Sequence, residues 1–168
     1  MKIRRIVISV LVAAALLLMP ATALADATQE VTVTATPTYI SISNSPATYD
    51  FGVITADTDE ITPDDHFTIT NDSTVDITVT IVCNGWTGDP TPANSWTYGP
   101  AAANTGQLKA SDGDSGYDVT VDDTTPATLA TTTTPGTDIS WEMQLDAPSS
   151  FTYGDEQTTT ITLAAAAS

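Results

Sequence analysis

The chain has 168 residues and a formal net charge of −17 at pH 7, because it holds 21 acidic residues and only four lysines and arginines. Three of those four are Lys2, Arg4 and Arg5, so beyond residue 25 a single lysine, Lys109, stands against all 21 acidic residues, a net charge of −20. Nucleic acids and anionic membranes are bound through basic side chains, and this charge excludes both as partners.

The N-terminus has the three parts of a secretory signal peptide. A basic start is followed by an apolar run over residues 6–19, interrupted only by Ser9, and by a small-residue stretch that ends at Ala25. We expect cleavage after Ala25, which predicts a signal peptide over residues 1–25 and a secreted or cell-surface chain over residues 26–168. The apolar run is shorter than the roughly 20 residues that a spanning helix needs, so no membrane insertion is expected after cleavage.

The chain beyond the signal peptide is long enough for one domain with its own core. Cys83 is its single cysteine, so an intramolecular disulfide cannot form. It follows Ile77, Val79 and Ile81 at alternate positions, which places all four side chains on the same face of a strand. Cys83 is therefore interpreted as a small buried hydrophobe, and an intermolecular disulfide is the alternative.

Residues with β-branched and aromatic side chains alternate with polar ones after residue 25, a pattern that predicts β-strands. In the first half these strands cover residues 30–35, 39–43, 49–54, 66–70 and 75–83. The 30–35 strand has Val31, Val33 and Ala35 on one face and threonines on the other. Gly52 predicts a bulge in the 49–54 strand.

In the second half, strands are predicted over residues 107–110, 116–121, 138–145 and 157–165, and residues 96–98 are a candidate for a further short strand. The 138–145 strand points Trp141 inward together with its alternate apolar neighbours. Residues 124–137, rich in threonine, proline and alanine, are interpreted as an exposed connection. About seven to nine short strands predict an all-β fold, an immunoglobulin-like antiparallel β-sandwich, as a single domain over residues 26–168.

An acidic, glycine-bearing loop in the second half carries Asp112, Asp114 and Asp118. Calcium takes six to eight oxygen ligands, and carboxylates at such spacing can converge on one ion. The glutamate that closes an EF-hand loop is missing, and no helices are predicted around the loop. The loop is therefore either a calcium site or a solvated acidic hairpin.

Residues 85–105 form a long stretch rich in glycine and proline that carries Trp86, Trp96 and Tyr98. Long loops with their own aromatic residues are often functional. Exposed rings in this stretch would stack on a glycan or anchor another partner. The alternative is that the same rings fold back and cap the sandwich.

The side chains that enzymes use most are scarce. His66 is the only histidine, so neither a histidine-based zinc site nor a second imidazole is available. No G-x-S-x-G sequence is present, and arginine is absent after residue 25. We therefore expect no enzymatic activity.

Three segments resemble the WxL-type surface domains of bacteria: residues 49–52 (YDFG), 85–87 (GWT) and 141–148 (WEMQLDAP). The resemblance implies a secreted, non-catalytic protein that associates with the cell wall. The chain also resembles, more broadly, the secreted β-sandwich subunits of surface filaments and matrix fibres. That wider resemblance implies that residues 30–35 are lent to a neighbouring copy by β-strand addition, the alternative being that they pair within their own sheet.

These observations lead to one main functional hypothesis and one alternative. The main hypothesis is a secreted, non-catalytic structural or adhesive protein of the cell surface, self-assembling and calcium-stabilised. The alternative is a monomeric extracellular module that binds a glycan or cell-wall polymer. The expected partners are accordingly copies of the chain itself, a glycan or a wall polymer.

Overall fold

The computed structural model describes residues 31–113 and 116–168, so the predicted signal peptide and Asp114 lie outside the described residues. The chain divides into Met1–Thr36 and a compact unit, Pro37–Ser168, which we call the sandwich. The described residues form twelve strands and one short 3-10 helix, η1 (Pro92–Asn94). Within that part of the chain, no helix is long and apolar enough to cross a membrane.

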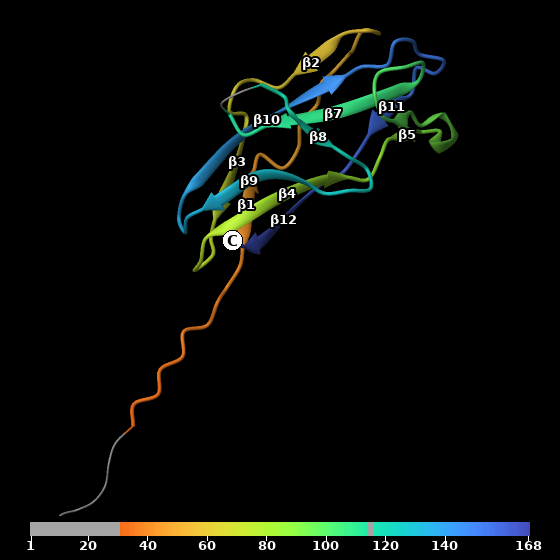
Figure 1. Cartoon of the computed structure of the whole chain (residues 1–168). Helices are drawn as coiled ribbons and strands as arrows, with labels where there is room; N and C mark the ends of the chain where they lie inside the picture. The colour runs from red at the N-terminus through yellow and green to blue at the C-terminus, as the bar shows by residue number, and fades with distance from the viewer. Residues whose placement is uncertain (1–30, 114–115) are drawn as a thin grey trace, which may run out of the picture. The chain divides into compact units, whose positions relative to one another are not determined.

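The strands form two main sheets and one small pair (Figure 1). The larger sheet contains β1 (Ile42–Ser45), β2 (Asp59–Ile61), β3 (Phe67–Asn71), β6 (Thr97–Tyr98), β7 (Thr105–Ser111), β8 (Val119–Val121) and β10 (Asp138–Asp146). The smaller sheet has the order β12 (Ile161–Ala167), β4 (Ile77–Cys83), β9 (Ala127–Thr133). A two-stranded sheet pairs β5 (Thr87–Asp89) with β11 (Glu156–Thr158).

The larger sheet is ordered β1-β3-β10-β7-β6, with β2 added to β10 and β8 added to β7. Its longest strand, β10, pairs with β3 through its first half and with β2 through its second half, while β7 lies along its other side. All strand pairs are antiparallel except the short β6–β7 pair.

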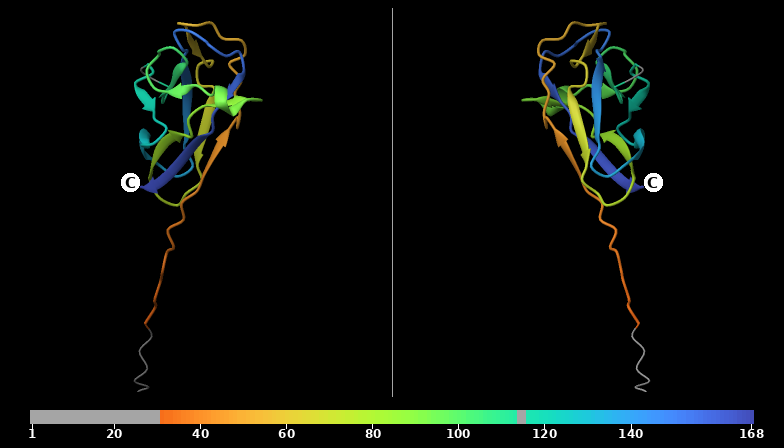
Figure 2. Two further views of the ribbon diagram at one scale, coloured as in Figure 1. Left: turned by 90° about the vertical axis from the view of Figure 1, so that its right-hand side faces the viewer. Right: turned by 90° about the vertical axis from the view of Figure 1, so that its left-hand side faces the viewer.

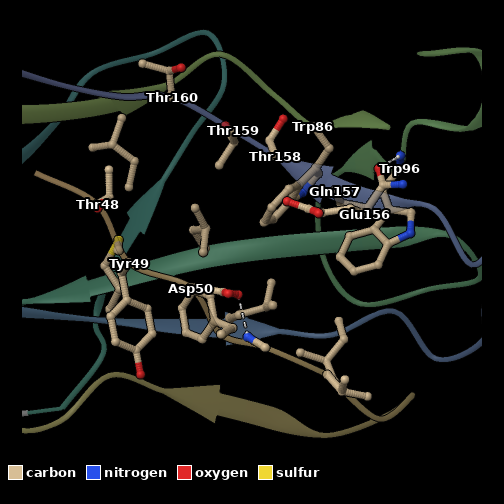
Figure 3. Close-up of a pocket in the computed structure, with 18 of the residues that line it drawn as sticks. Thr48, Tyr49, Asp50, Trp86, Trp96, Glu156, Gln157, Thr158, Thr159 and Thr160 are labelled. Atoms are coloured by element: carbon tan, nitrogen blue, oxygen red, sulfur yellow. Dashed lines mark hydrogen bonds between the residues drawn. The ribbon is translucent and has the colours of Figure 1, made fainter. Parts of the chain in front are cut away.

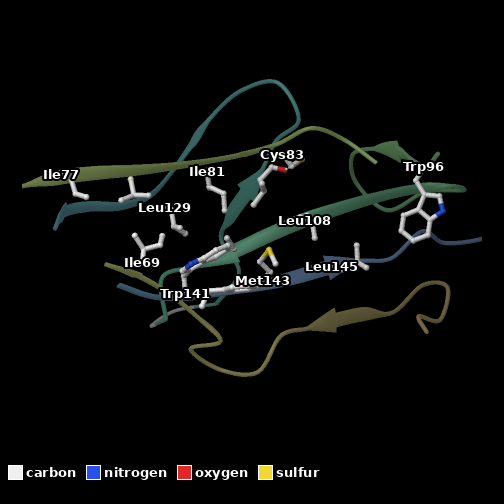
Figure 4. Close-up of a cluster of buried hydrophobic side chains, with 14 residues drawn as sticks. Ile69, Ile77, Ile81, Cys83, Trp96, Leu108, Leu129, Trp141, Met143 and Leu145 are labelled. Atoms are coloured by element: carbon white, nitrogen blue, oxygen red, sulfur yellow. The ribbon is translucent and has the colours of Figure 1, made fainter. Parts of the chain in front are cut away.

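The two main sheets lie face to face (Figure 2). In β3 and β4 every second residue is buried, so each strand turns one apolar face toward the other sheet. Figure 4 shows the resulting core, to which both sheets contribute. The Trp141 ring stacks on the Phe67 ring at a centroid distance of 4.4 Å. The predicted all-β antiparallel sandwich is confirmed, as are the buried positions of Trp141 and Cys83.

The described residues contain more strands than the seven to nine that the sequence predicted. Three of them, β2, β5 and β11, have only three residues each, too few for an alternating pattern to identify. The interpretation of residues 124–137 as an exposed connection is wrong, because β9 lies there and buries Leu129 and Thr133. Threonine is β-branched, and a threonine-rich segment suits a strand as well as a loop.

Two predicted strands do not form. The described part of the 30–35 segment is in no strand, and Val31 and Val33 are 83% and 85% exposed. Residues 49–54 are also in no strand, because the Asp50 carboxylate accepts the Gly52 N–H at 2.7 Å and Gly52 has a φ of 70°. This side-chain-stabilised turn interrupts the extended backbone where the sequence predicted a bulge.

The buried side chain of Asn71 joins the two main sheets. At the end of β3, its amide nitrogen donates to the carbonyl of Thr133 in β9 at 2.8 Å and to that of Val75, just before β4, at 3.2 Å. Its amide oxygen accepts the Ser73 N–H at 2.9 Å, and its backbone bonds to Gly136 and Thr137. One fully buried residue thus bonds to two connections that run between the sheets, the one from β3 to β4 and the one from β9 to β10.

We expect Asn71→Ala to lower the free energy of unfolding by about 3 kcal/mol, because it leaves buried carbonyls and an N–H without partners. Urea unfolding followed by tryptophan fluorescence measures this loss. Asp72→Ala is the control, since the neighbouring side chain is exposed and should change stability little. Equal stabilities of the two variants would contradict the role assigned to Asn71.

Candidate functional site

The sandwich is open along one side, where the two sheets do not meet. The opening, which we call the groove, has a volume of about 1050 Å³ and lies between residues 47–54 and residues 153–161. Figure 3 shows Tyr49 and Asp50 on one side, Thr158 to Thr160 on the other, and Trp86 and Trp96 at one end. The turn at Gly52 contributes to this opening because it keeps residues 49–54 out of either sheet.

The floor of the groove is the core itself. Phe67 from β3, Leu108 from β7, and Trp141 and Leu145 from β10 all line it. On the β12 side, the inward-facing residues Ile161, Leu163 and Ala165 are only half buried, although they pack against the core. The inward residues of the adjacent strand β4 are at most 1% exposed. The apolar face of β12 is therefore incompletely covered.

β12 is also an edge strand. Within the part of the chain that the structure describes, it pairs with β4 on one side and with no strand on the other. An edge of this length leaves alternate N–H and C=O groups available to a further strand. The groove thus combines an apolar floor with an unpaired backbone edge.

Aromatic rings close one end of the groove. Trp96 lies edge-on to Trp86 at 5.3 Å and stacks on Phe151 at 5.5 Å, and Gly106 has no side chain where the Trp96 ring packs. The Trp86 indole N–H donates to the Gly106 carbonyl at 2.9 Å, whereas the buried Trp96 indole N–H has no partner among the described residues. Phe151, at the same end, is 37% exposed, and Tyr153, which also lines the groove, is 42% exposed.

The sequence proposed Trp86, Trp96 and Tyr98 as a ligand-binding set, and the structure separates them. Trp86 and Trp96 line the groove, but Trp96 is only 8% exposed. Tyr98 is not among the lining residues; its hydroxyl donates to the Leu108 carbonyl and accepts the Leu108 N–H, each at 3.1 Å. Burial raises the pKa of Tyr98 above its usual value, although the hydrogen bond to the Leu108 backbone opposes this shift.

The most accessible rings of the groove are Phe151 and Tyr153, which sequence reasoning missed. The one sequence feature that could have revealed them is the alternation Phe–Thr–Tyr just before Gly154, in a stretch with no strong strand pattern. Nothing in the sequence placed Phe151 beside Trp96, because that contact joins segments more than 50 residues apart.

The calcium site proposed at Asp112, Asp114 and Asp118 stays a prediction. Asp112 and Asp118 are exposed, and Asp114 is outside the described residues. Among the residues that are described, no three histidine, cysteine, aspartate or glutamate side chains lie close enough together to hold a metal ion.

The charges around the groove are negative. Asp50, Asp155 and Glu156 line its rim. Lys109, the only basic residue beyond the predicted signal peptide, is paired at 2.6 Å with Asp146 and so is engaged within the sandwich. These carboxylates disfavour an anionic ligand in the groove.

The remaining reactive side chains are packed into the fold. His66 lies edge-on to the rings of Tyr49 and Phe67, each at 4.7 Å. Cys83 is a buried free thiol, and burial raises its pKa.

Comparisons with protein-family models, with curated proteins and with solved structures find no match to this chain. The similarity to WxL-type domains therefore stays a resemblance carried by three short segments. In two of them the tryptophans, Trp86 and Trp141, are followed two positions later by Gly88 and Met143 rather than by leucine.

We expect Trp96→Ala to lower the free energy of unfolding by about 3 kcal/mol, because it removes a buried ring that contacts both Trp86 and Phe151. Tyr153→Ala, at an exposed position on the same groove, should change it by less than about 0.5 kcal/mol. Chemical denaturation of both variants measures the difference. Similar losses would mean that Trp96 does not anchor this end of the sandwich.

Proposed function

We propose that the chain is a secreted, non-catalytic structural or adhesive protein of the cell surface that associates with copies of itself. The observation that carries the proposal is the groove, in which a partly covered apolar face lies beside the unpaired edge of β12. Monomeric proteins normally cover or blunt such an edge because it pairs readily with another chain. An edge left open on an otherwise well-packed sandwich favours a role in assembly.

The negative charge of the chain makes association between copies dependent on salt and divalent cations. A net charge of −20 beyond residue 25 makes copies repel one another at low ionic strength. Salt screens this repulsion, and divalent cations bound to surface carboxylates would reduce it further. The proposed calcium stabilisation, with Asp112, Asp114 and Asp118 as ligands, belongs to this part of the proposal.

The absence of catalysis is supported by the surroundings of His66, the only imidazole in the chain. Its ring makes edge-on contacts with the rings of Tyr49 and Phe67. General acid–base catalysis needs an imidazole within hydrogen-bond reach of a bound substrate. An imidazole that contacts two aromatic side chains suits packing better than proton transfer.

A second candidate function, glycan or cell-wall polymer binding, is favoured by Phe151 and Tyr153. Both rings are exposed beside the groove, and aromatic faces beside carboxylates and amides are suited to sugar recognition. This function would use the protein as a monomer.

The self-association is tested by light scattering and negative-stain microscopy on residues 26–168 over a range of protein concentrations. We expect oligomers or fibres whose population increases with protein concentration and with added salt, because salt screens the acidic surfaces. A parallel series with millimolar calcium, against magnesium as control, tests the calcium contribution. A monomer at every concentration and in every salt would contradict the proposal.

The second candidate function, glycan binding by a monomer, leads to a separate prediction. Tyr153→Ala should reduce binding to the recognised polymer by about tenfold while the fold is retained, because one stacking ring is lost. Glycan arrays followed by calorimetry measure this, with exposed Tyr39→Ala as the control. Unchanged binding in Tyr153→Ala would exclude this end of the groove as the glycan site.

A further inference from the structure

We infer that two copies of this chain associate through their β12 strands, which pair antiparallel about a two-fold axis at Ala164 and join the two smaller sheets into one sheet of six strands. The inference rests on the proposed self-association and names its contact surface, its register and its symmetry. Three features of the molecule carry it: the regularity of the β12 edge, the apolar face beside that edge and the distribution of charge between the sheets.

Among the described strands, β12 is the one long edge with an unbroken register. Its seven residues pair one to one with β4. The other edge of the same sheet, β9, has two register shifts against β4, and Thr132 within it has a φ of 52°. At the edge of the larger sheet, β1 has four residues and is followed directly by Pro46. Bulges, prolines and shortness protect an edge from pairing, and β12 has none of these protections.

The inward face of β12 is incompletely covered because of its position in the sheet. Ile161, Leu163 and Ala165 pack against the core but are only half buried. The neighbouring strand β4 lies between two strands, whereas β12 pairs with β4 alone in the part of the chain that the structure describes. A further strand beside β12, with apolar residues at alternate inward positions, would bury this face.

A second β12 is such a strand, since it has the same alternation. Antiparallel pairing about an axis perpendicular to the sheet keeps both apolar faces on the same side, whereas parallel pairing of two identical edges turns one face over. With the axis at Ala164, all seven residues pair, so that Ile161 lies opposite Ala167 and Leu163 opposite Ala165, inward position against inward position. Ala164 lies opposite its own copy, where its small side chain allows close approach.

Closure distinguishes a second copy from any other added strand. A single strand added to β12 presents its own outer edge to the next molecule. The symmetric pair uses both β12 edges at once, and the joined sheet ends on each side at β9, where the register shifts interrupt the edge. The contact is therefore isologous and stops at two copies.

The distribution of charge between the sheets permits this approach. None of the residues of β4, β9 and β12 is charged. The larger sheet, in contrast, carries Asp59 and Glu60 in β2 and Asp138, Glu142 and Asp146 in β10. Pairing through β12 thus brings uncharged strands together, and salt screens the repulsion between the rest of the two surfaces.

Engineered cysteines test the register. Directly opposite residues of antiparallel strands have Cα atoms about 4.5–5.5 Å apart, within the range of a disulfide. Ala164→Cys should therefore form a disulfide-linked dimer under mild oxidation, measured on a non-reducing gel. Thr162→Cys alone should not, because its two copies lie four residues apart along the strands, roughly 13 Å. A mixture of Thr162→Cys and Ala166→Cys chains should cross-link, since these positions lie opposite each other.

The control for these cross-links is the unmodified chain, whose single cysteine, Cys83, is buried. No cross-link in Ala164→Cys, or equal cross-linking of Ala164→Cys and Thr162→Cys, would overturn the inference.

Charge variants at the axis test the contact without a covalent bond. Ala164→Asp and Ala164→Lys each place like charges opposite one another, and each should associate about tenfold more weakly than the unmodified chain. An equimolar mixture of the two should regain the association, because opposite charges then face each other. Thr128→Asp and Thr128→Lys, at an exposed position of β9 in the same sheet, are the matched controls and should retain it both alone and mixed. Sedimentation velocity on residues 26–168 measures all of these, and equal behaviour at positions 164 and 128 would contradict the inference.

The failure of this inference is distinct from the failure of the proposed function. A chain that sediments as a monomer at every concentration and in every salt overturns the proposed self-association, and the inference with it. Association that is unchanged in Ala164→Asp, together with no disulfide in Ala164→Cys, retains the proposed function and overturns the inference alone.

Discussion

The buried amide of Asn71 is the constraint on which the arrangement of the two main sheets depends. β3 and β4 follow each other in sequence yet belong to different sheets, so the chain must cross from one layer to the other over residues 72–76. A crossing of this kind leaves backbone groups away from any ladder, and a buried unpaired group is costly. Asn71 bonds to the crossing, to the end of β9 and to the turn that precedes β10, which fixes all three. The chain has one cysteine, so hydrogen bonding and packing fulfil the role that a disulfide has in many small secreted domains.

The side of the sandwich that carries the groove is covered less completely. The turn at Asp50 and Gly52 prevents residues 49–54 from pairing, and β12 is left as an edge with a half-covered apolar face. Most natural sheets protect such an edge with lysines, prolines or a covering segment. Here the outward-facing residues of β12 are Thr162, Ala164 and Ala166. These small, uncharged side chains neither repel an approaching chain nor cover the edge of the strand. The strong negative charge of the remaining surface is what opposes uncontrolled association.

Strands differ in how clearly their residues reveal them, for identifiable physical reasons. Where a strand is long and buried on one face, as in β4 and β10, alternation of apolar and polar residues located it within two residues. In β9 the small and threonine-rich composition concealed the strand, because threonine is compatible with both strand and loop. At residues 49–54 the pattern was correct for a strand, but a local hydrogen bond from Asp50 prevailed over it.

The candidate site was less predictable than the fold. Trp86 and Trp96 were identified because tryptophans in a glycine- and proline-rich stretch are conspicuous, yet their packing against Phe151 and Gly106 depends on which segments fold together. The sequence by itself determined the all-β class, the inward faces of the main strands and the acidity that limits the possible partners, since these depend on local alternation and composition. Only the tertiary structure decided that β12 is an edge and that the core opens into a groove beside it. Pairing between distant strands and the gap it leaves are set by the whole chain, and no local pattern encodes them.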